Sequence, residues 1–298
     1  MRVKPYYLLL IVLGCLIPGA GNAEPWSKSI DASLTLTQNT YSDNWKGGES
    51  GSANWMFLSN SFLEKQLSSL IHNKNVLKLQ FGQTYVQQKE TKNWDKPEKS
   101  SDLIDFETVF RFSLNSWAEP FASGRLESQF LDSGEANNPV YFNPMTLTQS
   151  AGAIKVLVKE ETREWTLRFG GGFREHIDRE VLDPDTMKRD TDSSYDGGFE
   201  MVNDLRMPIF GDAIDVRSKL IVFQAVFFSK ADDFKGTPAE DYWKSPDINW
   251  ENVFTASITK YLMVNLYTQF LYDKQINKAG RFKQTLGLGL KWNYESIP

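Results

Sequence analysis

The two histidines, His72 and His176, are the residues with which this chain of 298 residues could perform acid–base chemistry. Hydrolysis by a serine nucleophile requires a histidine base beside the hydroxyl and a third group that orients the imidazole. The sequence contains no Gly-x-Ser-x-Gly, His-Glu-x-x-His or Walker motif. We place His72 in a solvated turn and His176 near the end of a strand. We therefore expect no catalytic residue, no enzymatic activity, and no metal or cofactor.

Charged side chains that alternate with apolar ones are the more informative chemistry. Asp105 and Glu107, for example, alternate with Ile104 and Phe106. Both signs occur in similar numbers, so these charges could line a narrow water-filled pore that selects solutes, or they could fill an enclosed interior with ion pairs. The residues that we expect to line this interior are Asp105, Glu107, Arg111, Arg125, Glu127, Arg168, Arg174, Glu200, Asp204, Asp215, Arg217, Lys219 and Glu251.

Extended segments must position these charges, because the alternation has the period of two that is typical of strands. It recurs at residues 102–114, 165–174, 199–205, 261–272 and 281–294. Segments of about 10–15 residues exceed ordinary globular strands and suit a tilted membrane strand. A soluble β-core would also alternate, but it would not require this length. Between Leu220 and Phe223 the apolar set changes face, which predicts a bulge there.

The connections between these segments alternate between short and long. Short connections are predicted near residues 69–75, 115–119, 159–163, 206–213 and 259–261, and long polar ones near 39–52, 88–101, 132–146, 178–194, 230–247 and 273–280. Outer-membrane barrels have this asymmetry of tight turns and long loops. The fold class that follows is all-β, a transmembrane antiparallel up-and-down β-barrel of about 12 strands, closed so that no backbone edge meets lipid.

The N-terminus predicts export. Arg2 and Lys4 precede an apolar stretch at residues 6–17, and small residues end at Ala23. This pattern is typical of a cleaved signal peptide, residues 1–23, and the run is too short for a membrane anchor. We expect residues 24–298 to form one barrel domain, exported through the Sec pathway to the outer membrane of a Gram-negative cell. Cleavage would remove Cys15, the only cysteine and the residue of an alternative lipoprotein site.

Overall composition excludes several other classes of protein. The 33 Lys and Arg against 38 Asp and Glu argue against a nucleic-acid partner. Aromatic residues make up 13% of the chain, too many for a disordered protein. The mean hydropathy of −0.42 argues against a helical membrane protein, whereas it suits a barrel, because half of each strand faces a polar interior.

Three sequence elements are distinctive: Asn44-Trp45-Lys46-Gly47-Gly48, Ile248-Asn249-Trp250-Glu251 and the terminal Leu286-Gly287-Leu288-Gly289-Leu290. Together they resemble the DUF3078 family of uncharacterised outer-membrane β-barrel proteins, found mostly in Bacteroidetes and their relatives. The resemblance implies a barrel and its location, and it carries no activity or catalytic residue. Members commonly stop at an aromatic residue, whereas this chain continues through Glu295-Ser296-Ile297-Pro298.

Three functions are compatible with these expectations. The leading hypothesis is a narrow porin-like channel for small polar solutes or ions, with Trp45, Tyr242 and Trp243 in long loops as candidates for recognition. The alternative is a plugged structural or assembly barrel that binds a partner protein, and the third is an outer-membrane lipid hydrolase. The expected partners are outer-membrane lipids, the barrel-assembly machinery during insertion, and a small polar solute.

Overall fold

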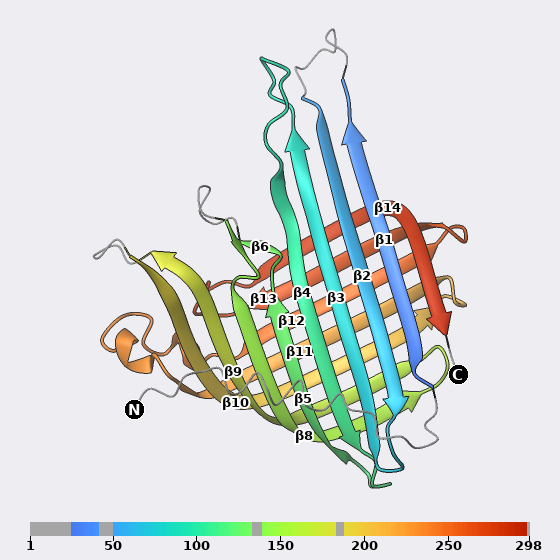
Figure 1. Ribbon diagram of the computed structural model, residues 1–298, viewed down its shortest axis with the longest axis vertical. Helices are drawn as coiled ribbons and strands as arrows, with labels where there is room; N and C mark the ends of the chain where they lie inside the picture. The colour runs from blue at the N-terminus through green and yellow to red at the C-terminus, as the bar shows by residue number, and fades with distance from the viewer. Residues whose placement is uncertain (1–24, 42–49, 133–138, 183–187, 297–298) are drawn as a thin grey trace.

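The computed structural model describes residues 25–41, 50–132, 139–182 and 188–296, and within them twelve long strands form a closed barrel (Figure 1). Every pair of neighbours is antiparallel, and β1 pairs with β14 to close the barrel. The strands are β1 (Ser27–Asn39), β2 (Ser52–Gln66), β3 (Ile71–Val86), β4 (Glu98–Phe112), β5 (Glu119–Ser128), β8 (Met145–Lys159), β9 (Glu164–Leu182), β10 (Arg189–Ile209), β11 (Ile214–Phe228), β12 (Asp247–Ser257), β13 (Leu262–Tyr272) and β14 (Arg281–Ser296). The predicted all-β barrel of about 12 strands is confirmed.

Short elements occur only in the connections, as far as the described residues go. β6 (Leu131–Asp132) and β7 (Val140–Tyr141) form a two-stranded sheet between β5 and β8. The 3₁₀ helices η3 (Ala231–Phe234) and η4 (Tyr242–Lys244) lie between β11 and β12. Among the described residues, no helix is long and apolar enough to cross a membrane.

The outer surface of the barrel is apolar because one face of each strand alternates outward. On β14, Leu286, Leu288 and Leu290 are exposed, and Phe169 on β9 stacks on exposed Phe199 on β10. Exposed aromatic side chains mark both rims of this apolar band, as in outer-membrane barrels. They include Tyr195, Phe227, Trp250 and Phe282 at one rim and Trp117, Trp165, Trp292 and Tyr294 at the other.

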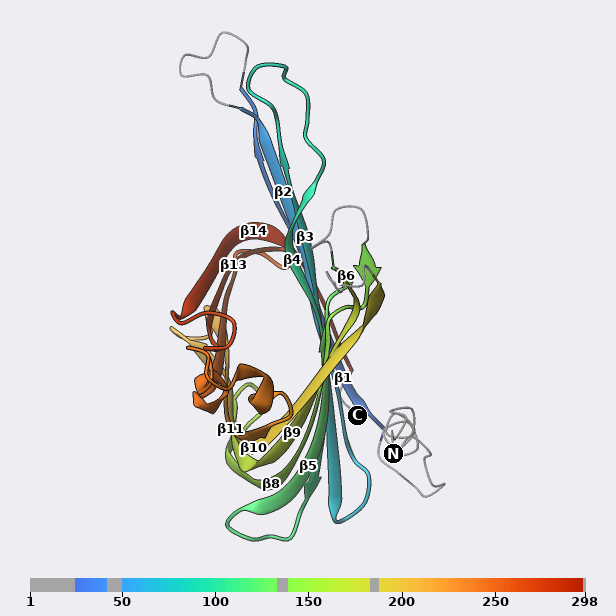
Figure 2. The same ribbon diagram turned by 90° about the vertical axis from the view of Figure 1, so that its left-hand side faces the viewer.

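The two ends of the barrel differ, and we name them by their connections. The turn end carries the short turns at residues 67–70, 113–118, 160–163, 210–213 and 258–261, and the loop end carries the longer connections. Lys28 pairs with Ser296, so both ends of the described chain meet at the turn end. Beyond the closed part of the barrel, β1–β4 project together at the loop end (Figure 2).

Two boundaries differ from the predicted ones. The turn expected at residues 69–75 ends at Leu70, so His72 lies on β3 with a half-buried ring and not in a solvated turn. Strands β9 and β10 extend to Leu182 and from Arg189, which shortens the connection expected at 178–194. Both errors arise because polar residues continue on the inward faces of the strands, where they resemble loop residues in the sequence.

The irregularity predicted near Leu220–Phe223 lies a few residues further along β11. The register shifts between Gly197 and Gly198 of β10, which pair with Phe227 and Ala225. Val226 is therefore the extra residue of a β-bulge. The predicted signal peptide, residues 1–23, lies outside the described residues.

Candidate functional site: the barrel interior

A central cluster of ion pairs crosses the interior at mid-height. On one wall, Lys219 of β11 and Glu251 of β12 are directly opposed in the strand register. The Lys219 ammonium lies 2.5 Å from the Glu107 carboxylate of β4, and Lys78 of β3 pairs with Glu251. By the shorter route, four strands separate β4 from β11 and another four separate β3 from β12. These two pairs therefore join opposite walls through the lumen.

Further charges surround Glu107 and complete the central cluster. The Arg168 guanidinium of β9 lies 2.5 Å from the second oxygen of Glu107, and Arg125 of β5 binds Asp105 through two hydrogen bonds of 2.7 and 3.0 Å. Asp105, Arg168 and Glu107 are only 2%, 4% and 7% exposed. At this height the interior is therefore filled by charged side chains in the described conformation.

Towards the loop end, an outer cavity of about 630 Å³ opens above the central cluster. At its floor the Arg174 guanidinium lies 3.7 Å from the ring centroid of Phe223, which is almost fully buried. Arg174 also donates to Asp196 at 2.6 and 2.9 Å and to Asp247 at 2.7 Å. Phe223 fits here because Gly172 has no side chain, since a Cβ at Gly172 would lie 3.0 Å from the ring.

The carboxylates of the outer cavity outnumber its cations. The cations are Arg125, Arg174 and Arg281, and the acids are Glu127, Asp178, Asp192, Glu200, Asp247 and Asp273. An acidic vestibule concentrates cations by its field. Glu200 accepts a 2.7 Å hydrogen bond from the Ser150 hydroxyl.

On the turn-end side of the central cluster lies an inner cavity of about 360 Å³. Arg217 of β11 reaches across it to Asp31 of β1 and also binds Asp215, 3.1 Å away on its own strand. Arg206 and Lys291 line the same cavity. The two cavities are thus separated by the central cluster.

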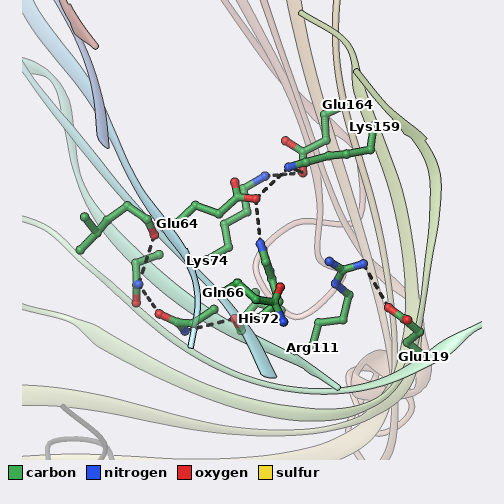
Figure 3. A network of polar contacts seen from close by, with 12 residues as sticks. Glu64, Gln66, His72, Lys74, Arg111, Glu119, Lys159 and Glu164 are labelled. Atoms are coloured by element: carbon green, nitrogen blue, oxygen red, sulfur yellow. Dashed lines mark hydrogen bonds and ion pairs between the residues drawn. The ribbon is translucent and has the colours of Figure 1, made fainter. Parts of the chain in front are cut away.

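At the turn end a second group of charges, the turn-end cluster, also links distant strands (Figure 3). The Glu64 carboxylate of β2 lies 2.8 Å from His72 Nε2 and 2.8 Å from Lys159 Nζ of β8. Lys74 of β3 lies 2.7 Å from Glu164 of β9. Arg111 and Glu119, 3.0 Å apart, complete this cluster. Its ion pairs join β2 to β8 and β3 to β9.

In the part of the chain that the structure describes, neither histidine is hydrogen-bonded to a serine hydroxyl. The His72 ring lies 2.8 Å from the Glu64 carboxylate. The Nδ1 atom of His176 lies 3.2 Å from the Thr146 hydroxyl, but the Asp196 carboxylate is 3.8 Å from Nε2, too far for a hydrogen bond, and is already bound by Arg174. Among the described residues, no group of three or more His, Cys, Asp or Glu side chains is placed to hold a metal ion.

The predicted interior residues lie on inward strand faces, and the structure brings them together in groups. Asp105, Glu107, Arg125, Arg168, Lys219 and Glu251 belong to the central cluster, Glu127, Arg174 and Glu200 to the outer cavity, Asp215 and Arg217 to the inner cavity, and Arg111 to the turn-end cluster. Asp204 lies opposite Lys219 in the register of β10 and β11.

The loop candidates are placed apart from these groups. Trp45 lies outside the described residues. The Trp243 ring lies 6.5 Å from that of Phe228, the last residue of β11, so Trp243 packs its loop against that strand. Tyr242 faces two cations, Lys274 and Lys278, at 4.9 and 5.5 Å from its ring centroid.

Four residues that sequence reasoning missed belong to the interior. Lys74 was assigned to a turn, and Lys78, Asp31 and Phe223 were not singled out. Lys74 and Lys78 share the even-numbered face of β3 with Gln80, so the strand period itself could have identified them. Phe223 gave no such signal, because β11 is apolar on both faces in this region.

Three solved structures are similar to this chain. The COG4313 outer membrane channel from Pseudomonas putida F1 aligns with a TM-score of 0.41 and 12% identity over 93% of this chain and 99% of that one. The translocator domain of the autotransporter NalP from Neisseria meningitidis aligns with a TM-score of 0.36 and 10% identity, over 96% and 93%. OprB from Pseudomonas putida aligns with a TM-score of 0.28 and 9% identity, over 91% and 94%.

No curated protein matches the chain. The model of the family DUF3078, described as a protein of unknown function, matches residues 36–133. This range includes the Trp45 element, whereas the elements at residues 248–251 and 286–290 lie outside it. The predicted resemblance to DUF3078 is thus confirmed for residues 36–133.

Proposed function

We propose that this protein is a narrow outer-membrane channel for small polar solutes or ions, and that the Sec pathway exports it. The central cluster closes the channel at mid-height. One observation carries the proposal: two cavities, each lined by several charged side chains, lie on opposite sides of a barrier made of ion pairs. Lysine side chains have long flexible stems, and their ion pairs can exchange partners, so such a barrier can open without moving a strand. Passage would then be diffusion between the cavities.

The barrel reconstituted in a planar lipid bilayer is expected to conduct. Because the closing groups are charged and paired, we expect brief openings of small conductance in 1 M KCl. We expect their frequency to be similar in 0.1 M KCl, since salt screens buried pairs much less than exposed ones. Single-channel recording measures this. Absence of any conductance at either concentration, from barrel shown to be folded by its heat-dependent gel mobility, would reject the channel.

The plugged barrel remains a second candidate because Asp105, Arg168 and Glu107 are so deeply buried. Buried ion pairs with full sets of partners can serve conformational specificity alone. A silent barrel that co-purifies with a stoichiometric partner would favour this function. The lipid hydrolase has no comparable support, because the Asp196 carboxylate is engaged by Arg174.

The acidic outer cavity predicts that the channel prefers cations. Glu200→Gln removes one carboxylate without changing side-chain size and keeps an acceptor for the Ser150 hydroxyl. We expect the cation-over-anion permeability ratio to fall about twofold, because local ion concentration follows the field of the vestibule. The reversal potential in a KCl gradient measures the ratio, with Glu160→Gln in an exposed turn as the control. Equal ratios for E200Q and wild type would show that Glu200 does not act on permeant ions.

A further inference from the structure

The seam between β1 and β14 is paired over only part of its length. The register runs from Lys28–Ser296 to Thr35–Gly289 and ends there among the described residues. β1 nevertheless continues to pair with β2 as far as Asn39, and β14 pairs with β13 from Arg281. Leu36–Asn39 and Arg281–Leu288 therefore present free backbone edges to each other. Figure 1 shows the two strands diverging above the paired part.

A second short seam of the barrel shows how such an edge can be covered. β4 and β5 also pair over few residues, from Ile104–Ser128 to Arg111–Phe121. There the Asp102 carboxylate accepts hydrogen bonds of 2.7 and 3.0 Å from the amides of Phe130 and Leu131. The free part of β4 is thus joined to the following connection. Within the described residues, the edges of β1 and β14 have no equivalent contact.

The free edges of β1 and β14 both carry apolar side chains on the outside of the barrel. Leu36 on β1 is 64% exposed, and Leu286 and Leu288 on β14 are 65% and 53% exposed. Hydrocarbon pairs no backbone groups, so the free edges of this seam need contact with water or with a polar group. The outward leucines suit contact with an acyl chain, and the polar end of an amphiphile would then lie where the chain enters the lumen.

A polar site lies inside the barrel, next to the free edge of β14. Lys283 points inward from β14, and its ammonium donates to the Ser101 hydroxyl of β4 at 2.6 Å. It lines a cavity of about 240 Å³ with Gln80, Tyr267 and Gln269. The cavity also contains Asp102 and Glu127, whose carboxylates are paired with Lys99 and Arg125. No carboxylate lies within 4.0 Å of Lys283 in the described part of the chain, in contrast to Lys78 and Lys219. A lysine with a hydroxyl partner and no carboxylate within ion-pair distance is suited to an anionic headgroup.

We propose that this seam is a lateral opening through which an amphiphile, an acyl chain with an anionic headgroup, exchanges between the membrane and the barrel interior. The headgroup binds Lys283 while the acyl chain lies between Leu36 of β1 and the exposed leucines of β14. The inference requires a barrel in the membrane but does not require conduction through the central cluster.

Binding of radiolabelled dodecanoate to the barrel in phosphatidylcholine nanodiscs tests the headgroup site. We expect saturable binding above that of empty nanodiscs, and about tenfold weaker binding for Lys283→Gln, the value of one charge-assisted hydrogen bond. The control is Lys291→Gln, which lies on the same inward face of β14 but at the inner cavity. Dodecyl phosphate should compete and dodecanol should not.

A disulfide tests the opening itself, because residues 24–298 contain no cysteine. Extending the register past Thr35–Gly289 would place Leu36 opposite Leu288. Oxidised L36C/L288C should therefore lose dodecanoate binding at least tenfold and recover it on reduction. The control L34C/L290C, which lies at a position already paired, should bind like wild type in both states. A pair that does not oxidise would report an opening wider than a disulfide spans, which also supports the proposal.

Three results would overturn the inference: no saturable dodecanoate binding by wild type, equal binding by K283Q and wild type, or unchanged binding by the oxidised L36C/L288C variant. Conductance recorded from the same preparations separates this from the proposed channel. Leu36 and Leu288 face outward, so the L36C/L288C disulfide should leave ion conductance unchanged. A barrel that binds dodecanoate without conducting ions would support the lateral opening and reject the proposed channel.

Discussion

Replacing Glu107 with glutamine is expected to raise the open probability of the barrel in a planar bilayer at least tenfold. The Glu107 carboxylate accepts from Arg168 and Lys219, each at 2.5 Å, and the second contact joins opposite walls. Glutamine keeps the size of the side chain but removes the charge, which weakens each charge-assisted hydrogen bond by about 1 kcal/mol or more. Since 1.4 kcal/mol is a factor of ten in an equilibrium, the closed state loses most of its advantage.

The same substitution should lower the stability of the folded barrel. Removing one partner of a buried ion pair leaves uncompensated charge and costs about 3 kcal/mol. Urea unfolding in lipid vesicles, followed by tryptophan fluorescence, measures this loss. Glu127→Gln is the matched control, because Glu127 pairs with Arg125 of its own strand, does not cross the lumen, and has a side chain 39% exposed. An E107Q barrel as closed as wild type would show that this carboxylate does not hold the barrier.

The sequence allowed the faces of the strands to be predicted, because a period of two depends only on local backbone geometry. Asp105 and Arg168 could thus be placed inside the barrel without knowledge of their partners. Which charge meets which across the lumen depends on how twelve strands close on one another. The Lys219–Glu107 pair joins residues 112 positions apart in the chain, and nothing local to either residue specifies that contact.

Local pattern also failed where both faces of a strand look alike. Ile221 and Phe223 face the outer cavity although they are apolar, and Leu220 and Val222 occupy the opposite face of β11. The predicted change of face was an interpretation of this double apolar run. The actual bulge lies at Gly197 and Gly198: a Cβ on Gly198 would overlap the Gln224 carbonyl, and one on Gly197 would overlap the Phe227 ring.

Glycines on the inward face of β9 provide the prediction with the largest effect on folding. Gly170 of β9 pairs with Gly152 of β8, and a Cβ built on Gly170 would overlap the carbonyl oxygen of Ala151. This atom belongs to the backbone and cannot rotate away, so the two strands would have to separate. We expect Gly170→Val to lower the free energy of unfolding by about 3 kcal/mol or more and to reduce the folded yield, because overpacking forces backbone shifts.

The adjacent glycine offers the control within the same segment. Gly171 is exposed on the outward face of the barrel, and the atom nearest to a Cβ there is the Gly198 carbonyl oxygen at 3.9 Å, an ordinary contact. Gly171→Val adds apolar surface towards lipid and should change stability by less than about 1 kcal/mol. Heat-dependent gel mobility and urea unfolding distinguish the two variants. If G170V and G171V fold equally well, the close approach of β8 and β9 is not what their paired glycines provide. The strands would then have room at this height for an inward side chain, and a barrel wide enough for that would also weaken the case for a closed centre.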